Sequence, residues 1–122
     1  MKKKLILVLS TIAPALLNPS YVNAQEVISQ QQCRTNFQGS LIEGVLLVER
    51  WSYHDTHRVY GRFHDSASNL IELEVFTNQP GGVGELWFNN ARHRAARIDL
   101  RPTSNGFVVY AEDGNVAQFQ CG

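Results

Sequence analysis

Hydrophobic residues alternate with polar ones along most of the chain after residue 40, and short groups of turn-forming residues interrupt the alternation. A period of two is typical of half-buried β-strands, whereas no long segment shows the 3.6-residue period of an amphipathic helix. We predict seven strands, near residues 40–53, 58–64, 70–77, 83–89, 97–102, 106–112 and 116–121. The expected fold class is all-β: a small antiparallel meander, closed as a barrel or folded as a two-sheet sandwich.

The segments between the predicted strands are rich in Gly, Pro, Asn and Asp, which turns favour. Asp113-Gly114 is the strongest hairpin signal, because a two-residue type I′ turn needs a positive φ at both central positions. Such a turn predicts four residues that share one face of the hairpin: Val108, Tyr110, Phe119 and Cys121. Residues 90–96 fit one helical turn or a long loop, and residues 25–32 fit a flexible N-terminus or a short helix.

The loop 65–69 sets the register of the two strands beside it. One face then pairs apolar residues: Phe63 with Ile71, Gly61 with Leu73 and Val59 with Val75. The other face pairs Arg62 with Glu72 and Tyr60 with Glu74, a charge-complementary arrangement that a one-residue slip would destroy. We therefore predict an apolar inner face and a polar outer face for these strands.

Extending the alternation to the next strand places Trp87 on the outer face, in a row with Tyr60 and Glu74. Aromatic rings beside carboxylates and arginines stack on sugar rings and anchor protein partners. The outer face is therefore a candidate binding surface, made of Tyr60, Arg62, Glu74 and Trp87. The alternative is that another part of the chain covers Tyr60 and Trp87, which then serve packing alone.

A basic cluster follows that strand, and it contains Arg92, His93, Arg94 and Arg97. Such a cluster can receive a phosphate, an acidic glycan or a carboxylate of a partner. We add Arg92 and Arg94 to the candidate binding residues. A solvated loop is the alternative interpretation.

Two motifs are candidates for catalysis or metal binding. Glu72 and Glu74 lie on one strand face, roughly 6.5 to 7 Å apart between Cα atoms, which suits paired carboxylates of a glycosidase. An ordinary ion pair with Arg62 explains the same charges, so we assign no catalytic residue. His54, Asp55 and His57 are too few for a zinc site, and no HExxH helix or cysteine pair completes them, so we expect no metal and no cofactor.

The N-terminus has the pattern of a secretory signal peptide. Three lysines precede an apolar run from Leu5 to Leu17, which is too short to span a bilayer. Val22 and Ala24 fit the small-residue rule for cleavage after Ala24. We therefore expect residues 1–24 to be a signal peptide and residues 25–122 to be a single β domain, periplasmic or secreted, with no membrane insertion after cleavage. The alternative is a retained N-terminal anchor, which the short length of the apolar run disfavours.

Charge and cysteine content narrow the function further. The full chain balances 11 basic against 11 acidic residues, and removal of three lysines with the leader leaves a net charge of −3. This charge argues against nucleic acid as a partner. Cys33 and Cys121 are the only cysteines, one near each end of the mature chain, and an oxidising compartment favours a disulfide between them.

No complete catalytic signature is present, since the chain has no GxSxG motif and both cysteines are assigned to a disulfide. We therefore expect a small exported protein of the cell envelope that acts as a non-catalytic binding or inhibitor-like module for a protein or glycan. The alternative is a small envelope hydrolase that uses the paired carboxylates or the histidine loop.

Overall fold

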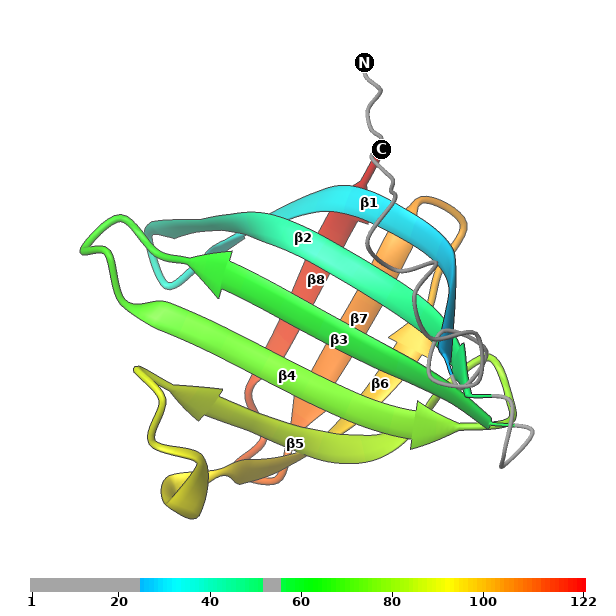
Figure 1. Ribbon diagram of the computed structural model, residues 1–122. Coiled ribbons are helices and arrows are strands. Elements are labelled where there is room, and N and C mark those ends of the chain that lie inside the picture. The colour runs from blue at the N-terminus through cyan, green and yellow to red at the C-terminus, as the bar shows by residue number, and fades with distance from the viewer. Residues whose placement is uncertain (1–24, 52–55) are drawn as a thin grey trace, which may run out of the picture.

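The computed structural model describes residues 25–51 and 56–122, and they form a closed barrel of eight antiparallel strands in sequence order (Figure 1). The strands are β1 (Gln25–Phe37), β2 (Ser40–Trp51), β3 (Thr56–His64), β4 (Leu70–Thr77), β5 (Gly82–Phe88), β6 (Ala96–Pro102), β7 (Gly106–Ala111) and β8 (Val116–Cys121). A 3₁₀ turn, η2 (Arg92–Arg94), lies between β5 and β6. Of the two predictions for residues 90–96, one helical turn or a long loop, it agrees with the helical turn. The predicted antiparallel meander is confirmed, and of the two predicted forms, barrel and two-sheet sandwich, the structure has the barrel. The predicted signal peptide lies outside the described residues.

The first strand was not predicted. Residues 25–32, expected to be flexible or helical, belong to β1, which pairs with β2 from Gln25 opposite Trp51 to Phe37 opposite Ser40. The glutamine-rich sequence shows little alternation, so the strand conformation comes from pairing with β2 and not from local pattern. A bulge between Val27 and Ser29 interrupts this ladder once.

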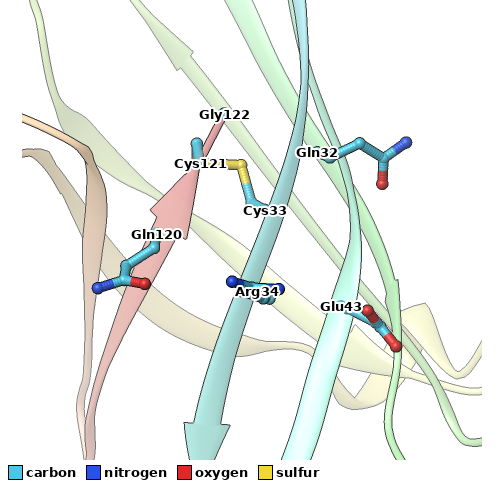
Figure 2. A pocket seen from close by; sticks show the side chains of 7 residues that line it. All are labelled: Gln32, Cys33, Arg34, Glu43, Gln120, Cys121 and Gly122. Carbon is cyan, nitrogen blue, oxygen red and sulfur yellow. A yellow bond between two sulfur atoms is a disulfide. The ribbon is translucent and has the colours of Figure 1, made fainter. Parts of the chain in front are cut away.

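The barrel closes between β1 and β8 over two residue pairs, Cys33 with Cys121 and Arg34 with Gln120. The predicted disulfide joins the two cysteines across this seam, where their Cα atoms are 4.0 Å apart (Figure 2). Beside it, the Gly122 N–H donates to the Gln32 carbonyl at 2.9 Å. The disulfide therefore reinforces the interface of the barrel that has the shortest described ladder.

Successive side chains of each strand point to opposite faces of the sheet, so every second side chain points into the barrel. Phe63, Phe107 and Phe119 fill its middle: Phe107 and Phe119 are stacked with ring centroids 4.5 Å apart, and Phe63 lies 5.0 Å from Phe119. Gly61 makes room for this arrangement, because a Cβ at that position would collide with the Phe63 ring. The core is thus built around an aromatic group that occupies the centre of the barrel.

The hairpin between β7 and β8 differs from the prediction. Only Gly114 of the expected turn pair has a positive φ, at 92°, and the Ala111 N–H donates to the Asn115 carbonyl at 2.9 Å. The loop is therefore longer than two residues, and the register moves by one position. Phe107 instead of Val108 faces Phe119, while Tyr110 is exposed on the outside.

Within the described part of the chain, no helix has the length and apolar character needed to cross a membrane.

Candidate functional site

The predicted register of β3 and β4 is confirmed on the outer face. Arg62 lies opposite Glu72 and Tyr60 lies opposite Glu74. Trp87 also faces outward, but it lies opposite Glu72 and not in the predicted row with Glu74. The predicted position of β5 was wrong by two residues, a shift that keeps the same side chains outside because the side-chain period of a strand is two.

Seven residues come together on this face, and we call them the outer-face cluster: Glu49, Arg58, Tyr60, Glu72, Glu74, Trp87 and Arg92. Trp87 is only 5% exposed although it lies outside the barrel, because the Arg92 guanidinium covers its indole ring, with Cζ 4.6 Å from the ring centroid. Arg92 reaches this position because Asn89 and Asn90 adopt positive φ angles of 49° and 66° and turn the chain at the end of β5.

Glu74 lies at the centre of the cluster and is 7% exposed. Its Oε2 accepts a hydrogen bond from Arg58 Nε at 2.6 Å, and its Oε1 forms an ion pair with Arg92 Nη2. Arg58 also donates to Glu49 Oε1 at 2.9 Å. Burial lowers the pKa of Arg58, and the hydrogen bonds with Glu49 and Glu74 raise it by more, so the net shift is upward. This guanidinium is charged at any physiological pH and neutralises buried carboxylates.

Tyr60 and Glu72 form the second half of the cluster. The Tyr60 hydroxyl donates to Glu72 Oε2, and Glu72 is 8% exposed. Burial, followed by this hydrogen bond, raises the pKa of Tyr60 to about 12. The phenol is therefore neutral and acts as a donor that satisfies a buried carboxylate.

The other residues predicted for the site do not belong to the outer-face cluster. Arg62 is exposed on the outer face, and Arg94 is exposed on η2. His57 lies on β3, whereas His54 and Asp55 fall outside the described residues. In the ranges that the structure describes, no three His, Cys, Asp or Glu side chains are grouped so that they could hold a metal ion. The expectation of no metal stays a prediction.

Sequence reasoning missed Glu49, which lies opposite Arg58 on β2. An antiparallel register drawn across the connection between Trp51 and Thr56 would have shown this pair. As a whole, the outer-face cluster pairs its charges internally: both oxygens of Glu74 are bound by guanidinium groups. Glu74 is thus poorly placed to exchange a proton with a substrate.

A second site, also missed, is a cavity of about 400 Å³ at the end of the barrel where β1 ends and β2 begins. We call it the barrel-mouth cavity. Its apolar wall comes from inward residues of seven strands, among them Ile42, Ile71, Leu86, Ile98, Val109 and Phe119. At its rim, Phe88 and Val116 are 52% and 50% exposed. Large apolar side chains at the ends of β5 and β8 were the signal in the sequence that could have pointed to it.

The rim of the barrel-mouth cavity is formed by ordered polar loops. Asp65 Oδ1 accepts hydrogen bonds from the N–H groups of Ala67 and Asn69, both at 2.9 Å. Asp113 Oδ1 accepts from the Asn115 N–H at 2.9 Å. Both aspartates thus fix their own loops, as Asx-turns do, and keep the opening of the cavity in shape.

A further cavity of about 440 Å³ lies at the other end of the barrel, with Phe107 and Leu100 in its wall. Phe107 and Phe119, which stack on each other, thus line opposite cavities and separate them. Residues 52–55 lie outside the described residues, and we assign no site to this second cavity.

No family model, curated protein or solved structure matches this chain.

Proposed function

We propose that the chain is exported and acts as a non-catalytic binding module of the cell envelope, which holds a small, largely apolar ligand in the barrel-mouth cavity. The observation that carries the proposal is the open apolar cavity itself. Ligand sites typically measure about 300 to 1,000 Å³, are lined by apolar side chains with a few polar groups, and occur in the mouths of β-barrels. The barrel-mouth cavity, at about 400 Å³, has each of these properties.

The outer-face cluster is the second candidate, as a surface that recognises a protein or glycan. Exposed Arg62 and Arg94 suit the rim of such a surface. Trp87, the expected anchor, is covered by Arg92, so a partner has to displace that side chain to reach the indole. For this reason the barrel-mouth cavity is the better-supported site.

A hydrolase that uses Glu72 and Glu74 has less support than either binding role. Tyr60 binds Glu72, and two arginines bind Glu74. A catalytic acid or base needs to reach the proton it transfers, at about 2.6 to 3.2 Å or through one water. Substrate would have to replace these internal partners before either carboxylate could act.

Export is supported by the leader sequence and is compatible with the disulfide, which persists in oxidising compartments. Mass spectrometry of the exported protein tests it. We expect a mature chain that begins at Gln25 and contains no thiol that can be alkylated without reduction. An intact leader on the exported protein, or two free thiols, would contradict this part of the proposal.

The neutral fluorescent probe N-phenyl-1-naphthylamine tests the binding site. We expect saturable binding to the wild-type protein. Ala117→Trp, which fills the barrel-mouth cavity from β8, should weaken binding at least tenfold. Gln118→Trp is the matched control, because the neighbouring residue points outward and the same ring then leaves the cavity open.

Circular dichroism establishes whether Ala117→Trp folds. If it does not, Val116→Gln at the exposed rim replaces it and should weaken binding severalfold. Absence of saturable binding to the wild-type protein overturns the proposed site, and so does equal binding by the folded cavity variants and the Gln118→Trp control.

A further inference from the structure

The charge at the rim of the barrel-mouth cavity indicates the class of ligand. Among the described residues that line the cavity, Asp65 and Asp113 are the only charged side chains. They belong to the β3–β4 and β7–β8 loops, which are four strands apart in a ring of eight. The two carboxylates therefore lie on opposite sides of the opening, above an apolar interior.

The hydrogen-bond partners of the two carboxylates do not neutralise them. Their partners are neutral: Asp65 accepts from Ala67 and Asn69, and Asp113 accepts from the backbone and the side-chain amide of Asn115. No arginine forms an ion pair with either carboxylate in the part of the chain that the structure describes. Hydrogen bonds from Asn69 lower the pKa of the Asp65 carboxyl, which favours its ionised form at neutral pH.

We infer that the ligand of the barrel-mouth cavity is a small amphipathic cation, with an apolar body and an ammonium or amidinium group. This inference rests on the proposed function of the cavity. The apolar body enters the barrel and loses its contact with water, which provides most of the affinity. The cationic group stays at the rim between Asp65 and Asp113, still partly hydrated, where the two carboxylates attract it.

Charge complementarity excludes the opposite class as the preferred ligand. An anionic amphiphile, such as a fatty acid, would bring its carboxylate close to two others, and like charges held together disfavour binding. An uncharged apolar molecule gains affinity from burial of its apolar surface but none from attraction to the carboxylates. Since the carboxylates are exposed to solvent, the preference for a cation over its neutral counterpart should be modest, roughly fivefold.

Three probes with the same ten-carbon chain test the inference: decylammonium, 1-decanol and decanoate. Each is titrated against protein loaded with N-phenyl-1-naphthylamine, at pH 8 and below the concentration at which it forms micelles. We expect decylammonium to displace the dye roughly fivefold better than 1-decanol, and decanoate to displace it less well than 1-decanol. The preference should shrink in 0.5 M salt, since both carboxylates are screened there.

The double variant Asp65→Asn/Asp113→Asn should make the three probes equivalent to within about twofold. An asparagine keeps one acceptor oxygen for the backbone N–H groups of each loop and loses only the bond from the neighbouring side-chain amide, so the loop turns are retained. Glu26→Gln/Asp99→Asn is the matched control, because it removes two charges from positions that do not line the cavity, Glu26 being exposed and Asp99 half-buried and paired with Arg101, and it should keep the wild-type preference. If the double variant does not fold, Asp113→Asn alone should halve the preference.

The possible outcomes separate the two proposals. If the dye itself does not bind, the proposed function fails. If the dye binds but decylammonium does not displace it, the inferred ligand class is wrong. If 1-decanol and decylammonium displace it equally well, or if the control variant loses the preference as the rim variant does, the cavity binds apolar ligands but the inferred cation is wrong.

Discussion

The guanidinium of Arg92 covers the indole of Trp87 and at the same time binds the carboxylate of Glu74. One side chain from the β5–β6 connection therefore buries a large aromatic residue on the outside of the barrel and neutralises a buried charge. Trp87 lies apart from the main hydrophobic core, so this small external group depends on a single exposed arginine for its cover.

Trp87→Ala should reduce the free energy of unfolding by about 3 kcal/mol, because it removes a large buried ring and leaves a cavity. Arg92→Ala should cost about 1 kcal/mol, since its side chain is half exposed and the contact is partly solvated. Urea denaturation measures both. Unchanged stability of Trp87→Ala together with loss of a protein or glycan partner would instead identify the outer-face cluster as a recognition surface.

Glu74→Gln should lower stability by about 2 kcal/mol, because two arginines lose their shared anionic partner inside the cluster. Combining it with Arg58→Met gives a double-mutant cycle, and we expect the two effects to be less than additive. Additive effects would show that the contact between Arg58 and Glu74 contributes no stability. If a hydrolytic activity is found, its retention in Glu74→Gln excludes this carboxylate as the acid or base.

Stability should fall as the pH rises from 10 to 12, in part because of Tyr60. Its pKa is near 10 in the unfolded chain and about 12 in the folded one, so in this window the folded protein keeps a proton that the unfolded chain has released. The contribution is fully present below pH 10 and is lost as the pH passes 12. Tyr60→Phe should flatten this dependence, measured as the difference between the two melting curves. An equally steep loss in both proteins would argue against the hydrogen bond with Glu72.

Replacement of both Cys33 and Cys121 by serine should lower stability by about 2 to 5 kcal/mol, since the disulfide closes a chain of 88 residues. We also expect a local effect. Amide hydrogen exchange should accelerate most in β1 and β8, where only two residue pairs hold the seam, and least in β3 and β4. Uniform acceleration in all strands would show that the seam opens only when the whole barrel unfolds.

Alternation along the chain was enough to predict seven of the eight strands, since residues such as Leu73 and Val75 face a dry core at every second position. β1 was beyond this reasoning. The residues Gln30, Gln31 and Gln32 do not alternate between hydrophobic and polar. Their strand conformation depends on pairing with β2, which the local sequence of β1 does not indicate.

The outer-face cluster was also predicted only in part. Loop length alone placed Tyr60 opposite Glu74, but nothing local distinguished the two registers of β5 that leave Trp87 outside. The cover that Arg92 provides depends on the left-handed conformation of Asn89 and Asn90, and the barrel-mouth cavity depends on the closure of all eight strands. Both are properties of the assembled fold.

The stacked pair of Phe107 and Phe119 divides the interior of the barrel into two dead ends. A molecule in the barrel mouth has no passage to the far side and has to leave through the opening by which it entered. Its residence time is then set by the loops around that opening, and a substitution such as Asn115→Gly, which loosens one of them, should change the dissociation rate more than the association rate. The two cavities have the geometry of separate pockets at the two ends of the barrel, not that of a channel through it.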